Sequence, residues 1–141
     1  MATVTLGGTP VNTISNLPEV GSPAPAFTLS RNDLTSVTLN DYRGRKLILN
    51  IFPSVDTGVC AQSIRTFNQK ATALENTEVL CISRDLPFAQ DRFCGAEGIE
   101  NVITLSDFAT GDFGKDYQLE ITNGPLSNLH SRAIVVIDEN G

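Results

Sequence analysis

Cysteine is scarce in this sequence, which has only Cys60, Cys81 and Cys94 among its 141 residues. A small secreted fold stapled by disulfides needs more cysteines, and an odd number would leave one thiol unpaired. The scarcity therefore favours a reducing compartment. In such a compartment, a cysteine pair that forms a bond is more often catalytic than structural.

Long apolar runs and an excess of basic residues are also missing. No stretch approaches the ~20 apolar residues that a membrane-spanning helix requires. Residues 1–21 have neither the basic start nor the apolar block of a secretory signal. The 10 basic residues are outnumbered by 16 acidic ones, giving a net charge of −6 that repels a phosphate backbone. We expect a cytoplasmic protein with no membrane or nucleic-acid partner.

Histidine occurs once, as His130, and this limits the metal chemistry that the chain can support. A zinc site usually contains cysteine or histidine ligands in closely spaced pairs. Neither the three cysteines nor His130 forms such a pair. We expect no metal site and interpret His130 as a polar loop residue.

The composition is that of an ordinary globular domain, with 40% hydrophobic and 18% charged residues. No repeat, low-complexity tract or long linker divides the chain, so residues 1–141 are expected to form one domain. Short apolar segments between turn residues predict strands at Phe27 to Leu29, Val37 to Leu39, Leu47 to Phe52, Val79 to Ser83, Val102 to Leu105 and Ala133 to Ile137.

Helices are predicted between several of these strands. Apolar residues recur at helical spacing from Val59 to Leu74, and Pro87 opens a short helix that runs through Cys94. Strands that alternate with helices predict an α/β fold with a mostly parallel or mixed sheet and helices on its faces. At the N-terminus, Thr3 to Leu6 and Val11 to Ile14 predict an edge hairpin.

Cys60 lies where the strand ending at Phe52 gives way to the helix beginning near Val59. Unpaired N–H groups and the dipole at a helix N-terminus favour a thiolate, lowering the thiol pKa below about 8.5. The carboxyl end of a central strand is also where α/β sheets usually hold their sites. The alternative is a small buried apolar residue, as free cysteines often are. The position favours the chemical role.

Thr57 and Pro53 both precede Cys60, and each of them has a structural and a chemical interpretation. Thr57 can cap the helix, and its hydroxyl can also hold one peroxide oxygen while a thiolate attacks the other. Pro53 can simply end the strand, because it has no N–H for the sheet, or its ring can shield the thiolate from water.

Pro53, Thr57 and Cys60 reproduce without gaps the Pro-x-x-x-Thr-x-x-Cys pattern of the peroxiredoxins, which this chain therefore resembles. A second segment runs Ser-Arg-Asp-Leu-Pro-Phe-Ala-Gln-Asp-Arg-Phe-Cys from Ser83 to Cys94. It is similar to the signature of the thiol peroxidase branch of that family. This second motif is long and highly specific, and with the N-terminal hairpin the resemblance covers essentially the whole chain.

The resemblance implies a thioredoxin-like fold with an added N-terminal hairpin and a central mixed sheet. It implies that Cys60 is the peroxidatic cysteine and that Cys94 is the resolving cysteine, which closes an intramolecular disulfide. It also implies reduction by thioredoxin, a homodimer, and a preference for alkyl hydroperoxides over hydrogen peroxide. No metal, haem or flavin is needed. Members of the family usually continue with another strand and a helix beyond the position of Gly141.

Arg132 corresponds to the arginine that the family places near the thiolate, and a predicted strand follows it. A lone arginine would otherwise be interpreted as a solvated surface charge. Cys81 lies inside an apolar strand, so we expect it to be an inert core thiol.

Two other functions remain as alternatives on this fold. A thiol–disulfide oxidoreductase would have a Cys-x-x-Cys motif, whereas Cys60 is followed by Ala61, Gln62 and Ser63. A redox sensor or a non-catalytic binding module would keep the fold and perform no turnover. Consumption of peroxide with a thioredoxin system distinguishes an enzyme from these.

Overall fold

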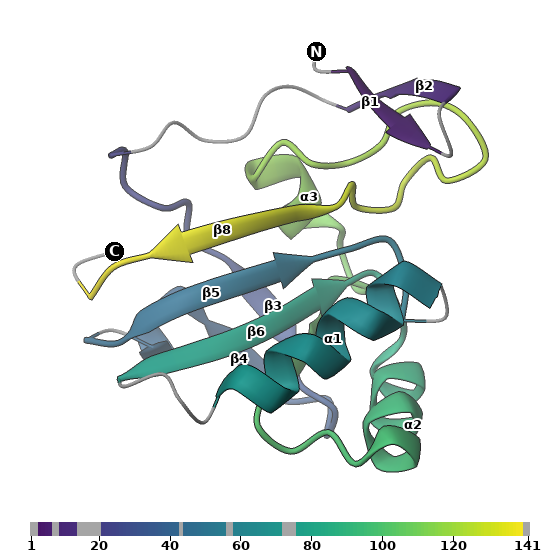
Figure 1. Ribbon diagram of the computed structural model, residues 1–141. Helices are drawn as coiled ribbons and strands as arrows, with labels where there is room; N and C mark the ends of the chain where they lie inside the picture. The colour runs from purple at the N-terminus through teal and green to yellow at the C-terminus, as the bar shows by residue number, and fades with distance from the viewer. Residues whose placement is uncertain are drawn as a thin grey trace.

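The computed structural model describes residues 3–6, 9–13, 21–42, 44–55, 58–71 and 76–139, with the side chains of residues 3–11 and 58–60 outside that description. A six-stranded mixed sheet crosses the molecule in the order β4-β3-β7-β6-β5-β8. Strands β8, β5 and β6 of this sheet lie side by side in Figure 1. Its strands are β3 Thr28–Ser30, β4 Ser36–Thr38, β5 Lys46–Ile51, β6 Thr77–Ser83, β7 Ile103–Ser106 and β8 Ala133–Ile137. Strands β5, β6 and β7 are parallel. Strand β3 pairs antiparallel with β7, β8 pairs antiparallel with β5, and β4 pairs antiparallel with β3. The predicted mixed α/β sheet is confirmed.

Helices cover both faces of this sheet. Helices α1 (Gly58–Ala71) and α2 (Pro87–Glu97) pack on one face, and the short helix α3 (Asp112–Asp116) lies on the other (Figure 1). A 3₁₀ helix, η1 (Leu39–Tyr42), follows β4. Because α1 and α2 each connect two neighbouring parallel strands, they form the crossovers that such strands require. None of the described helices is long and apolar enough to cross a membrane.

Strand β5 shows why the sheet needs cover on both faces. Leu47, Leu49 and Ile51 point into the core on the α3 face. Ile48 and Phe52 face the side of α1 and α2. A strand buried on both faces is expected to be a nearly continuous apolar run, as this one is.

Helix α2 begins and ends at residues suited to those positions. Pro87 occupies its first turn, where the missing proline N–H costs nothing. Gly98 ends the helix with a φ of 65°, and its N–H donates to the carbonyl of Cys94. The helix therefore runs one turn beyond the predicted end at Cys94.

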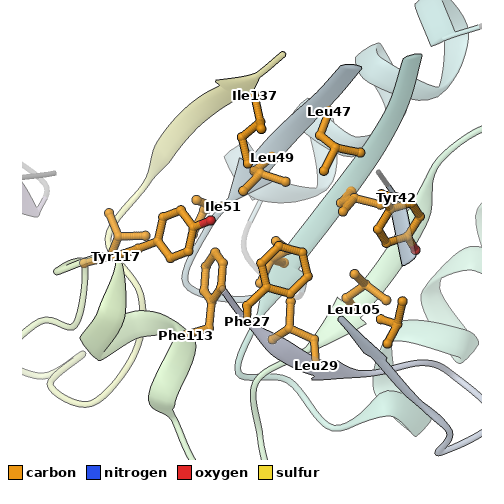
Figure 2. Packing of buried hydrophobic residues seen from close by; sticks show 14 residues of the cluster. Phe27, Leu29, Tyr42, Leu47, Leu49, Ile51, Leu105, Phe113, Tyr117 and Ile137 are labelled. Atoms are coloured by element: carbon orange, nitrogen blue, oxygen red, sulfur yellow. The ribbon is translucent and has the colours of Figure 1, made fainter. Parts of the chain in front are cut away.

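The α3 face holds an aromatic core (Figure 2). The Phe113 ring stacks on Tyr117 at 4.4 Å between centroids and meets the edge of Phe27 at 5.8 Å. The Tyr117 hydroxyl donates to the carbonyl of Pro25 at 2.8 Å, which satisfies the polar end of a buried side chain. These contacts attach α3 and the chain before β3 to the sheet.

The strand predictions agree with the structure to within about two residues, and two features depart from the predictions. The N-terminal hairpin is present as β1 (Thr3–Leu6) and β2 (Thr9–Asn12), so its second strand starts two residues earlier than predicted. Helix α3 was not predicted at all, because five residues are too few to show a helical period. The predicted last residues of α1, 72–74, lie outside the described residues.

Candidate active site

Strands β5 and β6 finish at the same end of the sheet at which β8 starts. There α1 begins at Gly58, so Cys60 falls in its first turn, as predicted. Pro53 is half-buried just beyond β5. Thr57 and the side chain of Cys60 lie outside the described residues, so the contacts predicted for them stay predictions. The placement of α1 is nevertheless the one that activates a thiol at a helix N-terminus.

The pairing register of β8 with β5 places Arg132 at the same end of the sheet. Strand β8 pairs antiparallel with β5, and Ala133 lies opposite Ile51. Arg132 therefore stands beside the end of β5, near the chain that leads to Cys60, and its side chain is exposed. The predicted strand after Arg132 is confirmed, and a role at the thiolate stays a prediction.

Asp85 is a site residue to which the sequence motif attached no role. Its carboxylate accepts hydrogen bonds from the Ser54 hydroxyl at 2.7 Å and from the Val55 backbone N–H at 2.8 Å. The Ser83 hydroxyl donates to it at 2.6 Å. The loop after β5 and the loop after β6 are thereby joined. Asp85 lies inside the segment that resembles the thiol peroxidase signature, which was the only sequence signal for it.

Cys94 lies on α2 as a half-buried free thiol. Its Sγ is 3.8 Å from the Thr104 hydroxyl, which in turn donates to Asn32 at 3.0 Å. Burial raises the pKa of Cys94, and the hydrogen bond with Thr104 partly offsets that effect. The thiol also lines a pocket of about 580 Å³ together with Arg31 and Asp91. Cys94 is therefore protonated at neutral pH and is adjacent to an open space.

Cys81 is fully buried on β6, as predicted from the apolar strand around it. Burial raises its pKa to about 12, although the Asn50 side-chain amide donates to its Sγ at 3.7 Å. The same amide also donates to Ser63 on α1 at 3.2 Å. A thiol held in this way is a core group and a poor nucleophile.

His130 differs from its interpretation as a polar loop residue, because it is completely buried. Its Nε2 lies 2.9 Å from the Asp107 carboxylate, which also accepts the N–H groups of Phe113 and Gly114. A Cβ on Gly114 would lie 2.7 Å from the imidazole ring, so glycine is required there. No local pattern marks His130 as buried, since its partners come from distant parts of the chain.

Metal-binding groups do not gather in the part of the chain that the structure describes. No cluster of three or more histidine, cysteine, aspartate or glutamate side chains there could hold a metal ion.

Comparisons with known proteins agree on one family. A sequence model described as Redoxin matches residues 19–141. Thiol peroxidases from Mycobacterium tuberculosis H37Rv and Mycobacterium bovis are each 56% identical over 141 residues, covering 100% of this chain and 84% of theirs.

Solved structures give the same result. A peroxiredoxin-like protein from Aquifex aeolicus superposes with a TM-score of 0.92 at 34% identity, over 99% of this chain and 81% of that one. A thiol peroxidase from Chromobacterium violaceum superposes with a TM-score of 0.86 at 25% identity, over 97% of this chain and 79% of that one.

Proposed function

Because the chain belongs to the Redoxin family and is a thiol peroxidase of the peroxiredoxin class, we propose that Cys60 is its peroxidatic cysteine and Cys94 its resolving cysteine. The observation that carries this assignment is the placement of Cys60 in the first turn of α1, at the carboxyl end of a central strand. Cys81 is buried and its pKa is raised to about 12, which argues against it as the nucleophile.

In the first step, the Cys60 thiolate attacks the terminal oxygen of a hydroperoxide. A sulfur–oxygen bond forms, the oxygen–oxygen bond breaks, and the leaving oxygen takes up a proton to become alcohol or water. Cys60 is left as a sulfenic acid. Thr57 orients the peroxide, Arg132 stabilises the charge on the leaving oxygen, and Pro53 limits access of water. The register of Ala133 opposite Ile51 supports this role for Arg132.

In the second step, Cys94 attacks the sulfenic sulfur. A sulfur–sulfur bond forms, and the hydroxyl group leaves with the thiol proton as water. Burial raises the pKa of Cys94 in the reduced protein, so the thiol must lose its proton as it approaches. We propose that the first turn of α1 and residues 87–94 loosen locally so that the two sulfurs can meet.

The remaining assignments rest on membership of the peroxiredoxin class. Thioredoxin supplies the two electrons that reduce the disulfide, and alkyl hydroperoxides are preferred over hydrogen peroxide. The working unit is a cytoplasmic homodimer, each chain contributing residues 1–141 to one thioredoxin-like peroxidase domain. No cofactor takes part, since the thiols exchange all of the electrons.

The test is the intact mass of the reduced protein after one equivalent of a hydroperoxide. We expect the loss of two hydrogens, and peptide mapping should locate the new bond between Cys60 and Cys94. The Cys81→Ser variant is the control and should give the same result. An unchanged mass, or a bond that includes Cys81, would contradict the assignment.

A further inference from the structure

A single carboxylate joins the two segments that carry the reactive cysteines. Asp85 follows β6 and stands two residues before Pro87, where α2 begins. Its two oxygens accept hydrogen bonds from Ser54 and Val55, which lie on the way from β5 to Cys60. The partners are 30 and 31 residues apart in sequence. These bonds therefore bring together two loops that no local structure would join.

On the Cys60 side, the bond to Val55 determines the path of the backbone. The segment leaves the sheet at Phe52, whose N–H donates to the Ile82 carbonyl, and α1 begins at Gly58. Between them, the side chain of Val55 is 1% exposed and packs in the cluster with Ala61. A backbone N–H beside so buried a side chain is costly to leave without an acceptor. Without Asp85 this segment would have to shift.

On the Cys94 side, Asp85 is itself held from two directions. The Ser83 hydroxyl donates to its carboxylate and accepts a hydrogen bond from the buried Gln90 amide of α2 at 3.2 Å. The same amide donates to the Leu105 carbonyl at 2.8 Å, and the Ser106 hydroxyl donates to the Asp85 carbonyl. Asp85 is therefore held at its backbone carbonyl by β7 and at its carboxylate, through Ser83, by the helix that carries Cys94.

We propose that Asp85 is a positioning residue that holds the Cys60 segment in the arrangement required for attack on peroxide, and that its bonds to Ser54 and Val55 oppose the loosening required for the disulfide. The inference rests on the proposed roles of Cys60 and Cys94. In-line attack on the peroxide bond is sensitive to geometry. A shift of about 1 Å in the position of a reacting group can cost on the order of 10²-fold in rate. Local loosening, in contrast, becomes easier when bonds that oppose it are removed.

Two rate constants should therefore change in opposite directions in Asp85→Ala. Single-turnover kinetics would follow formation of the sulfenic acid and then of the disulfide, at a pH at which the Cys60 thiolate is fully formed. We expect the first rate constant to fall roughly 10- to 100-fold and the second to rise. A loss of global stability alone would not produce this pair of changes.

Asp41→Ala is the matched control. Asp41 also accepts a backbone N–H and a hydroxyl, both from Thr38, but it lies beside β4 at the opposite edge of the sheet from β8. Both rate constants should stay at wild-type values in this variant. Asp85→Asn retains one oxygen for the Val55 N–H and should fall between Asp85→Ala and the wild type. Ser54→Ala removes the hydroxyl that donates to Asp85 but keeps the Val55 bond, and it should show a smaller change in the same directions.

These two milder variants carry the test if Asp85→Ala does not fold. Wild-type values of both rate constants in Asp85→Ala, or in both milder variants, would overturn the inference. So would equal slowing of the two steps. Absence of a Cys60 sulfenic acid in the wild type would instead reject the proposed function itself, so the two failures are distinguishable.

Discussion

The two faces of the sheet carry cores of different kinds. Among the described residues, the face toward α3 holds fourteen buried apolar side chains, four of them aromatic and none of them cysteine. We call it the aromatic face (Figure 2). The face under α1 and α2 holds nine, including Cys81, with Cys94 packed against them. We call it the cysteine face. The two cysteines whose side chains the structure describes thus lie on one side of the sheet.

This division separates two physical requirements. A peroxidase that forms a disulfide between distant segments must loosen part of its structure without losing the rest. The aromatic face joins β3, α3 and β8 to the central strands through large buried side chains, which dominate core energetics. The cysteine face carries α1 and α2, the two helices that the proposed disulfide requires to loosen. Substitutions on the two faces should therefore have separable effects on stability and on chemistry.

The largest expected effect is that of Cys60→Ser, in the first turn of α1. Because the attacking sulfur is lost while a small side chain is kept, peroxide turnover should fall to the level of the uncatalysed reaction. Circular dichroism and thermal unfolding should remain close to wild type. Retention of turnover by Cys60→Ser, together with its loss in folded Cys81→Ser, would show that the nucleophile is misassigned.

Cys94→Ser should come next, because it removes the second step and leaves the first. The variant should consume one equivalent of peroxide and then stop at the Cys60 sulfenic acid. Excess peroxide should drive that sulfur to the sulfinic and sulfonic acids, which intact mass would detect as successive additions of oxygen. Continued turnover with thioredoxin would exclude Cys94 as the resolving residue.

A pair of truncations compares the faces directly. Phe113→Ala on the aromatic face should lower the free energy of unfolding by about 3–5 kcal/mol and leave the peroxide rate constant within about twofold of wild type, measured where the protein is folded. Phe93→Ala, beside Cys94 on the cysteine face, should also destabilise the fold and should in addition change the rate of disulfide formation. Denaturant melts and single-turnover kinetics measure the two quantities. Equal kinetic effects of the two variants would refute the division.

The smallest expected effect is the pH dependence of alkylation at Cys94 and Cys81, the two thiols whose side chains the structure describes. Burial raises the pKa of Cys94 and, to about 12, that of Cys81. Since only the thiolate is alkylated, labelling of Cys94 should be slower than that of a free thiol at neutral pH and should keep rising above about pH 8.5. Cys81 should stay unlabelled until the fold opens. Mass-mapped iodoacetamide labelling of Cys60→Ser across pH measures both.

The raised pKa of a buried thiol also makes the free energy of unfolding depend on pH. A thiol whose pKa is raised on folding favours the folded state while it is protonated. Its contribution is present below the unfolded pKa of about 8.5 and is lost as the pH rises toward the folded value. For Cys81 that loss should set in above about pH 8.5 and continue toward 12. Cys81→Ala should weaken this part of the alkaline destabilisation.

Features that depend on neighbouring residues could be predicted from the amino-acid order alone. The strands β5, β6 and β8 follow from their apolar runs, and Cys81 follows from its place inside one of them. The first-turn position of Cys60 follows from a strand that ends in proline and a helical period that begins just after it. Residue spacing therefore predicted the fold class and the position of Cys60, whereas the roles proposed for Cys94 and Arg132 came from the resemblance to the peroxiredoxins.

Which distant groups meet depends on how the strands and helices are arranged in the folded chain. The bonds from Ser54 and Val55 to Asp85 cross about 30 residues. The buried pair of Asp107 and His130 crosses 23. Such contacts depend on strand order and register, because a change of one residue in pairing would carry a side chain to the opposite face. The residue pattern within one segment does not specify that register. Only the folded chain therefore shows that the Asp85 carboxylate joins the two segments that carry Cys60 and Cys94.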